Sequence, residues 1–249
     1  MPEKGCGAML KVIYQPKGRA LEYSPWAANL YRGCGHSCEY CYAPSALRMT
    51  PDEFSRPTAR VGIIDKLAHD ASELQSYGQQ LKVLLCFSCD CFQPLNSELG
   101  LARQAIEALH FYGQSVVILT KGGYRALPDI PLLRQGDEFA VTLTCDNEAD
   151  SMRWESNAAP PQERIDTLME AKARGVYTWV SLEPVLYPEQ SLALITRTHE
   201  FVDFYKLGVL NYHLRANEIN WGDYGNKAVA ELQKLGKGFY IKADLKKYL

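Results

Sequence analysis

Three cysteines near the N-terminal end of the chain have the types and spacing of metal ligands. Cys34, Cys38 and Cys41 are arranged as C-x3-C-x2-C within a short stretch. Iron–sulfur clusters are normally held by four cysteine thiolates, and no fourth cysteine follows at a comparable spacing. Three thiolates can ligate three irons of a cubane 4Fe–4S cluster and leave the fourth iron open. The spacing therefore indicates an iron–sulfur cluster with one open iron.

A structural zinc site is the main alternative for these thiols. Such sites usually combine two C-x2-C pairs, or one such pair with two histidines. Cys38 and Cys41 form one pair, whereas Cys89 and Cys91 are separated by a single residue and the five histidines are scattered. The sequence favours the iron–sulfur cluster. A non-enzymatic iron–sulfur or zinc module that binds a partner is kept as an alternative.

The composition fits a single large α/β domain. The 249 residues are 47% hydrophobic and 22% charged, which suffices for a full core. The net charge of −2 lacks the basic excess of proteins that bind duplex nucleic acid. It does not exclude a local basic groove or a nucleotide substrate.

The sequence gives no sign of a membrane partner. No apolar run approaches the roughly 18 residues of a membrane span, and the first residues lack the apolar core of a signal peptide. Eight clustered cysteines fit a reducing cytosol and a metal centre better than a secreted disulfide scaffold. We therefore expect a cytoplasmic protein, with a monomer as the expected oligomeric state.

Apolar segments alternate with helical patterns along the chain, which is typical of repeated βα units and a parallel sheet. Gly113, Gly175 and Gly236 follow three of the helical patterns, as C-terminal caps do. Helices are expected at 62–77, 98–112, 162–174, 190–199 and 227–235. Strands are expected at 29–32, 81–88, 115–121, 139–144, 177–182 and 202–209, and 239–241 is a seventh strand or an edge.

Six βα units are too few for a closed eight-fold barrel and fit an open one. The predicted fold is therefore α/β, a partial (β/α)6 barrel of the TIM type, in which chemistry gathers at the carboxyl ends of the strands. One domain spans residues 1–249. It divides into a lead-in (1–28), the barrel core (29–210) and a C-terminal segment over the barrel mouth (211–249).

The stretch from Tyr31 to Pro44, YRGCGHSCEYCYAP, resembles the cluster loop of radical S-adenosylmethionine (SAM) enzymes related to spore photoproduct lyase, many of which are labelled DNA repair photolyase-like. The resemblance continues through residues 13–23, 86–94, 119–121, 142–144 and 154–164, and so spans most of the chain. It implies that the open iron chelates the amino and carboxylate groups of SAM.

The resemblance also implies which residues bind the cofactor. Asp90 matches a carboxylate that pairs with the SAM ammonium group, and Lys121 matches a lysine that meets the SAM carboxylate. Thr142 matches a hydroxyl on the fourth strand. Beside the cluster ligands Cys34, Cys38 and Cys41, the implied cofactor-binding set is Tyr40, Tyr42, Ser88, Asp90, Lys121, Thr142 and Thr144.

One departure concerns the hydrogen donor. Spore photoproduct lyase has a hydrogen-donating cysteine three positions before the matched aspartate, where this chain has Phe87. This difference argues against thymine-dimer repair. Cys89 is a candidate hydrogen donor in its own right, as is Cys91. The plainer interpretation of Cys86, Cys89, Cys91 and Cys145 is small buried thiols, and an auxiliary metal site remains open.

Glu183, in SLEP at the end of the fifth strand, is a second departure, because the lyase has an apolar residue there. A carboxylate at a buried strand end suggests a contact with substrate or SAM, or acid–base work, and the alternative is a salt bridge with a neighbouring lysine or arginine. Lys206 could meet a carboxylate or phosphate, or pair with Glu183. Lys242 belongs to a lysine run that is typical of a solvated face or of a weak phosphate-binding patch. The candidate catalytic residues are thus Cys89, Glu183 and Lys206.

Four residues are candidates for binding the substrate. Glu155 and Arg164 match a Phe-Glu…Arg pattern of the family. Asn211 and Tyr212 follow the sixth strand and suit stacking on a nucleobase, or packing of the C-terminal segment over the barrel mouth.

The resulting hypothesis is a lyase- or isomerase-type radical SAM enzyme. A flavodoxin- or ferredoxin-type donor reduces the cluster, SAM is cleaved to a 5′-deoxyadenosyl radical, and that radical abstracts a hydrogen atom from the substrate. The first substrate class is a pyrimidine base or nucleotide, free or in DNA. The alternative is a small amino-acid-like metabolite that is isomerised or dehydrogenated.

Overall fold

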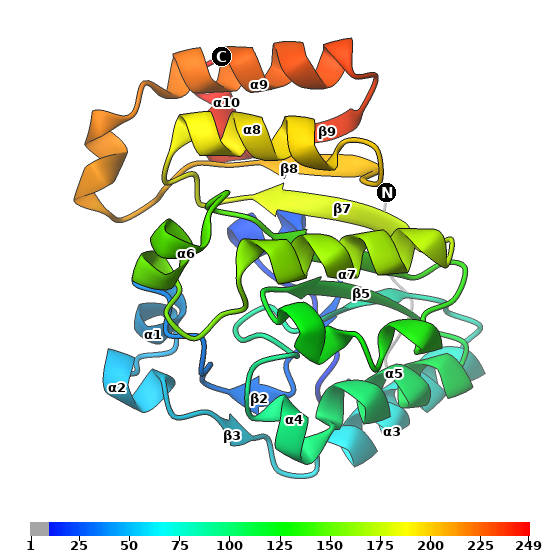
Figure 1. Cartoon of the computed structure of the whole chain (residues 1–249). Coiled ribbons are helices and arrows are strands. Elements are labelled where there is room, and N and C mark those ends of the chain that lie inside the picture. Colours follow the sequence, from blue (N-terminus) through cyan, green and yellow to red (C-terminus); the bar gives the residue numbers. More distant parts are fainter. Residues whose placement is uncertain (1–9) are drawn as a thin grey trace.

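The computed structural model describes residues 10–249, and its central element is a curved sheet of seven strands that all run parallel (Figure 1). Their spatial order is β1-β4-β5-β6-β7-β8-β9, so each strand after β1 pairs with the next one along the chain. The bounds are β1 (Ala27–Ala28), β4 (Lys82–Leu85), β5 (Ser115–Thr120), β6 (Glu138–Thr142), β7 (Tyr177–Leu182), β8 (Phe204–Leu207) and β9 (Gly238–Ile241).

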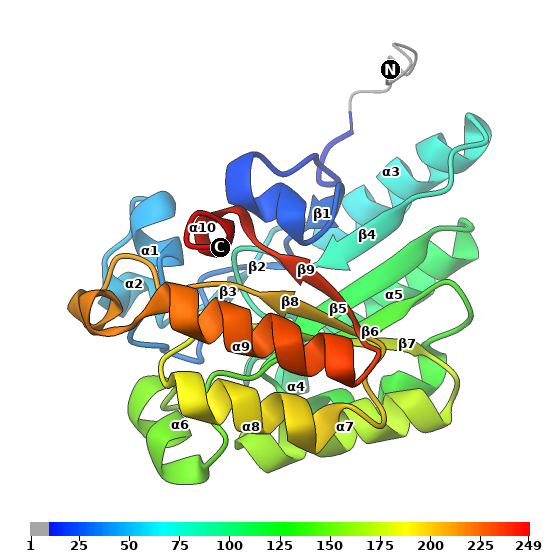
Figure 2. The ribbon, with the colours of Figure 1, turned by 90° about the horizontal axis from the view of Figure 1, so that it is seen from above.

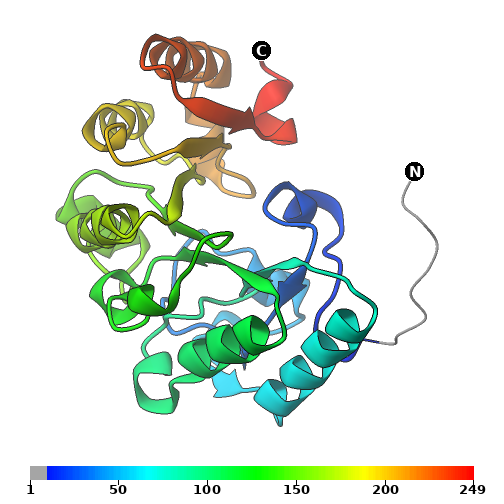
Figure 3. The same ribbon diagram turned by 90° about the vertical axis from the view of Figure 1, so that its right-hand side faces the viewer.

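The long helices cover the outer face of this sheet, and the concave face forms the inside of the partial barrel (Figure 3). Parallel neighbours require crossover connections, and helices supply most of them here. Leu84, Val117, Ala140 and Trp179 pack together in a small apolar cluster, separate from the larger core beneath the helices. The long helices are α3 (Ile63–Ser76), α5 (Leu101–Phe111), α7 (Pro161–Ala173), α8 (Pro188–Thr198) and α9 (Trp221–Lys234).

Shorter elements complete the fold. Several of them lie near the carboxyl ends of the strands, where the connections are longest. Of residues 10–249, no helix is long and apolar enough to cross a membrane. The short elements are η1 (Gly18–Glu22), α1 (Ala43–Ala46), α2 (Pro51–Phe54), α4 (Asn96–Leu99), η2 (Gly123–Ala126), η3 (Ile130–Leu132), α6 (Glu148–Trp154), η4 (Leu214–Glu218) and α10 (Ala243–Lys246).

The predicted partial barrel is confirmed, and 239–241 proves to be a strand: β9 pairs in parallel with β8 along its whole length. The predicted first strand, 29–32, is wrong. The sheet begins at Ala27–Ala28, and Tyr31–Arg32 is β2, which pairs antiparallel with β3 (Thr58–Ala59). Asn29 explains the break, because its Oδ1 accepts from the backbone N–H groups of Phe87 and Ser88, both at 2.8 Å.

The described part of the lead-in, residues 10–28, fills the opening between the first and last strands of the barrel. Figures 2 and 3 show η1 beside α10 and β9. Glu22 Oε1 accepts hydrogen bonds from the backbone N–H of Ala243 at 2.7 Å and from the Tyr240 hydroxyl at 3.2 Å. Arg19 Nε lies 2.6 Å from Asp244 Oδ2. The two ends of the described chain are thereby joined at the barrel mouth.

Candidate active site

A cavity of about 560 Å³ opens at the carboxyl ends of the strands. Its walls come from the cysteine loop, the ends of β4 to β9, η1 and the segment that follows β8. The structure brings most of the predicted site residues to this one cavity. They are Cys34, Cys38, Tyr40, Cys41, Tyr42, Ser88, Cys89, Asp90, Lys121, Thr142, Glu183, Asn211 and Tyr212.

The cysteine loop is held by short elements that pack over it. The backbone N–H of Cys34 donates to the Phe54 carbonyl at the end of α2, at 2.8 Å, and that of Cys41 donates to the Cys38 carbonyl at 3.1 Å. Gly33 permits this approach: its φ is +88°, and a Cβ there would lie 2.6 Å from the Phe54 carbonyl oxygen. Ala43 and Phe54 then form an apolar cluster with Cys34.

The three thiols of this loop suit a polynuclear iron cluster. Burial raises the pKa of Cys34 well above its usual range and raises that of Cys38 to about 11, although Lys121 opposes the rise at Cys38. Bound iron would displace these protons. Within residues 10–249, no three potential ligands converge on a single ion site. A cubane cluster does not need such convergence, because each thiolate binds a different iron.

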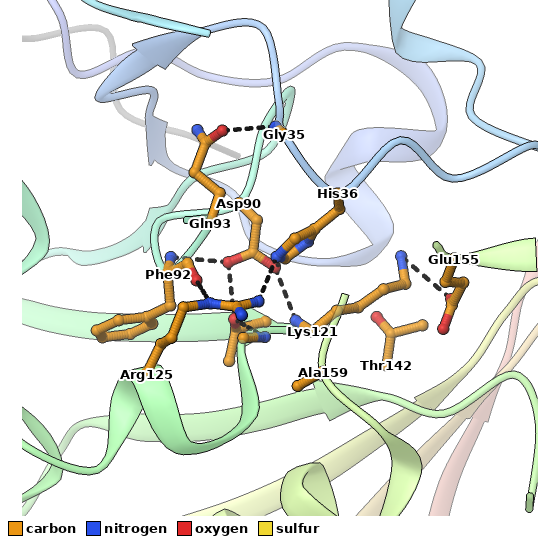
Figure 4. A network of polar contacts seen from close by, with 12 residues as sticks. Gly35, His36, Asp90, Phe92, Gln93, Lys121, Arg125, Thr142, Glu155 and Ala159 are labelled. Atoms are coloured by element: carbon orange, nitrogen blue, oxygen red, sulfur yellow. Dashed lines mark hydrogen bonds and ion pairs between the residues drawn. The ribbon is translucent and has the colours of Figure 1, made fainter. Parts of the chain in front are cut away.

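Asp90 links the ends of β4 and β5 (Figure 4). Its Oδ1 accepts from the Thr120 hydroxyl at 2.7 Å and from the backbone N–H of Phe92 at 2.8 Å, and its Oδ2 accepts from the backbone N–H of Lys121 at 2.7 Å. His36 Nδ1 lies 3.4 Å from the same Oδ2. The carboxylate therefore fixes the backbone that presents Lys121, and ties it to the cysteine loop.

His36 is a buried, neutral member of this network. Burial lowers its pKa from 6.5 to about 4. Arg125 Nη2 lies 2.9 Å from His36 Nε2 and Arg125 Nε donates to the Phe92 carbonyl at 2.8 Å. Since a guanidinium only donates, Nε2 accepts and the ring proton sits on Nδ1, facing Asp90. Arg125 gave no sequence signal, because it lies in η2, far along the chain from the motif.

Glu155 and Arg164 form a fully buried ion pair behind the cavity wall. Arg164 Nη2 lies 2.6 Å from Glu155 Oε2, the Tyr40 hydroxyl donates to Glu155, and Lys121 Nζ lies 3.8 Å from Oε1. Burial opposes ionisation, but Arg164 and Lys121 outweigh it and lower the pKa of Glu155 from 4.5 to about 2. Neither member of the pair lines the cavity. Glu155 is connected to the cavity through Tyr40 and Lys121, which contact it and line the cavity.

Two further predicted residues lie away from the cavity surface. Thr144 is buried and its hydroxyl faces Cys145 Sγ at 3.8 Å. Lys206 lies inside the barrel, where its Nζ donates to the Glu22 and Tyr23 carbonyls, both at 2.9 Å, and stands 4.3 Å above the centre of the Trp179 ring. Burial lowers the pKa of Lys206 to about 8. It does not pair with Glu183, contrary to one of the two sequence-based alternatives.

The lysine that pairs with Glu183 is Lys242. Its Nζ is bound to Glu183 Oε2, which also accepts from the Tyr23 hydroxyl. The Lys242 side chain is only 3% exposed, so its assignment to a solvated lysine face is wrong. The lysine run gives no sign of this burial, because it depends on the position of Lys242 directly after β9 and beside Glu183.

The remaining cysteines fall into two groups. Cys86 and Cys89 line the cavity; Cys86 Sγ accepts from the backbone N–H of Leu30 at 3.3 Å, and Cys89 Sγ donates to the Tyr31 carbonyl at 3.5 Å. Cys91 and Cys145 are buried and do not line it. All seven cysteines in the described part of the chain are free thiols.

The sequence matches the family model of the Radical SAM superfamily over residues 28–202. The match covers more than half of the chain and includes the cysteine loop and the strands β4 to β7. The protein belongs to the radical SAM superfamily.

Two groups of curated relatives match this chain over more than two thirds of its length. An uncharacterised protein of Mycobacterium tuberculosis is 28% identical over 181 residues, which cover 69% of this chain and 52% of that protein. An uncharacterised protein of Methanocaldococcus jannaschii is 22% identical over 189 residues, 75% of this chain and 70% of that protein. The chain thus spans about half the length of the mycobacterial relatives it matches.

Solved structures share the fold at low sequence identity. A spore photoproduct lyase mutant with bound AdoMet and dinucleoside spore photoproduct superimposes with a TM-score of 0.72 at 12% identity, covering 96% of this chain and 80% of that one. Streptococcus suis SuiB bound to S-adenosylmethionine gives 0.64 at 9% identity, covering 87% and 50%. These matches agree with the partial barrel of this chain.

Proposed function

We propose that the protein is a radical SAM enzyme that uses a 5′-deoxyadenosyl radical to abstract a hydrogen atom from a bound substrate. The observation that carries this proposal is that Cys34, Cys38, Cys41 and Lys121 line one cavity in a chain of the radical SAM superfamily. A reduced 4Fe–4S cluster on the three thiolates would supply the electron that cleaves SAM. A flavodoxin- or ferredoxin-type donor is the proposed source of that electron.

The residues around the loop are arranged to bind and orient SAM. Lys121 Nζ is held near Glu155 and 5.4 Å from the centre of the Tyr40 ring, with 18% of its side chain exposed. It can bind the SAM carboxylate while Glu155 keeps it charged. Asp90 is the proposed partner of the SAM ammonium group, although both of its oxygens already accept hydrogen bonds within the fold. Thr142 and Ser88 complete this wall.

For the substrate we propose a pyrimidine base or nucleotide. The structural likeness to a lyase that binds a dinucleoside photoproduct supports this class. Aromatic side chains on the cavity wall, Tyr42 and Phe87 with ring centres 6.4 Å apart, offer surfaces for a flat ring. Cys89, which faces the cavity beside Cys86, is a proposed hydrogen donor to a substrate radical.

A small amino-acid-like substrate is the second candidate. The oppositely charged Glu183 and Lys242 in the same cavity favour it, since they match an ammonium and a carboxylate group. Cytoplasmic location, a monomeric state and the absence of a membrane partner remain proposals.

Single substitutions of the loop cysteines test the proposal. Anaerobically reconstituted protein, reduced with dithionite and given SAM, should form 5′-deoxyadenosine. Cys34→Ala, Cys38→Ala and Cys41→Ala should each lose both the cluster and this product, because each variant has only two of the three thiolates that hold the cluster. Ser45→Ala, an exposed change just after the loop, is the matched control. A cysteine variant that still cleaves SAM at a 4Fe–4S cluster would contradict the proposal.

A further inference from the structure

A second polar cluster lies in the cavity, built from elements other than the cysteine loop. Tyr23 follows η1, Glu183 follows β7 and Lys242 follows β9; we call these three residues the Glu183 cluster. Glu183 Oε2 accepts from both the Tyr23 hydroxyl and the Lys242 ammonium group. Lys242 Nζ also stands 3.8 Å above the centre of the Tyr23 ring. The cluster therefore joins three segments that are distant in sequence.

The backbone makes room for this cluster at Gly208. Leu182, Leu207 and Ile241 are paired across β7, β8 and β9, so the next residue of each strand, Glu183, Gly208 and Lys242, stands at one level. A Cβ on Gly208 would lie 2.5 Å from Glu183 Cδ and 2.6 Å from its Oε1. Glu183 can therefore cross β8 to reach Lys242 because position 208 has no side chain.

Some donors and acceptors of the Glu183 cluster have no hydrogen-bond partner within residues 10–249. Within residues 10–249 nothing donates to Glu183 Oε1, since both of the contacts to this carboxylate go to Oε2. An ammonium group has three donors, and only one of those on Lys242 is used in a hydrogen bond. The cluster thus presents a free acceptor beside free donors. Glu183 and Lys242 offset each other's charge, and Lys242 Nζ also lies 4.0 Å from Glu22 Oε2, so a ligand without net charge suits the cluster.

Flat side chains border the cluster. The Tyr23 and Phe87 ring centres are 5.9 Å apart, and Phe87 and Tyr42 continue the row at 6.4 Å. All three line the cavity, and Tyr42 is 49% exposed. Such a row can stack on one planar ring whose edge points at the cluster.

We propose that the Glu183 cluster binds the imide edge of a uracil- or thymine-type ring, in which a ring N–H lies beside a carbonyl group. The N–H donates to Glu183 Oε1, and the carbonyl oxygen accepts from Lys242 Nζ. This assignment rests on the proposed function and narrows its substrate class to bases with that edge.

Equilibrium binding of two nucleosides tests the assignment. Uridine and 3-methyluridine, in which the ring N–H is replaced by N–CH₃, are titrated by calorimetry into cluster-loaded, unreduced protein with SAM present. A hydrogen bond to a charged group implies that uridine binds about tenfold or more tightly than its methylated analogue. Glu183→Gln removes the charge but keeps an accepting oxygen, so it should reduce this preference, and Lys242→Met should weaken the binding of both nucleosides.

Gly208→Ala provides an independent variant. It keeps the carboxylate but displaces it, and should weaken uridine binding in the same way as Glu183→Gln. It carries the test if Glu183→Gln fails to fold, as judged by circular dichroism. Glu189→Gln and Lys246→Met change exposed residues of the same charges on nearby helices and should leave binding unchanged.

The possible outcomes separate this inference from the proposed function. Absence of uridine binding, a wild-type protein without preference, or a preference that is undiminished in both Glu183→Gln and Gly208→Ala would each overturn the inference. So would binding of L-alanine, in place of uridine, that is lost in both Glu183→Gln and Lys242→Met. If the same preparation cleaves SAM, only the inference falls; if it holds a cluster but yields no 5′-deoxyadenosine with any substrate, the proposed function falls.

Discussion

The side chains of this site have two different roles. Some line the cavity, and others hold the cavity-lining side chains in position. Glu155 is the clearest supporting residue, because it is fully buried and contacts Arg164, Tyr40 and Lys121. The sequence placed it in direct contact with substrate. The structure places it one layer behind, where its carboxylate faces two cations and its position orients a tyrosine and a lysine.

Replacing Glu155 should therefore be costly for stability. Glu155→Gln leaves the Arg164 charge buried without its carboxylate, and we expect the free energy of unfolding to fall by about 3 kcal/mol or more. Glu170→Gln removes one partner of an exposed pair with Arg174 and should cost less than about 1 kcal/mol. Urea denaturation measures both variants. Equal losses would contradict the supporting role.

The same carboxylate predicts a pH dependence. Its pKa is lowered from 4.5 to about 2 in the folded protein, so its contribution to stability is fully present above pH 4.5. That contribution is lost as the pH falls from 4.5 towards 2, because the unfolded chain takes up the proton first. The stability difference between wild type and Glu155→Gln should shrink over this range. A difference that stays constant would show that Glu155 is not held ionised.

At the scale of elements, the segment η1 closes the open side of the barrel. Glu22 is its main contact, since its side chain binds the Ala243 N–H and the Tyr240 hydroxyl. Glu22→Ala should release η1 and α10 together, and hydrogen exchange at residues 18–23 and 243–247 should become faster. Glu200→Ala, at an exposed position after α8, is the control. Unchanged exchange in Glu22→Ala would mean that other contacts hold the closure.

The sequence predicted the elements best where periodicity extends over many residues. The strands β4 to β8 and the helices α3, α5, α7, α8 and α9 were all expected, because their apolar spacing is regular. The first strand failed because a two-residue strand, Ala27–Ala28, has no periodicity and Asn29 ends it through its side chain. A local sequence pattern does not reveal that the Asn29 side chain, in place of its backbone, forms the hydrogen bonds to the segment that follows β4.

At the scale of the whole molecule, the site is assembled by contacts between distant parts of the chain. The cysteine loop and the strand-end residues Asp90 and Lys121 could be predicted, because their motifs are local and the barrel brings strand ends together. Tyr23, Lys242 and Arg125 could not. Each enters the site through a contact with a residue 59 to 160 positions away. Only the three-dimensional structure shows that these three residues belong to the site.

The central claim is that Cys34, Cys38 and Cys41 hold a cluster whose open iron binds SAM. Electron paramagnetic resonance of the reduced, reconstituted protein, recorded with and without SAM, tests it most directly. We expect a signal of a reduced 4Fe–4S cluster whose spectrum changes when SAM is added. A 4Fe–4S spectrum that SAM leaves unaltered would contradict the claim.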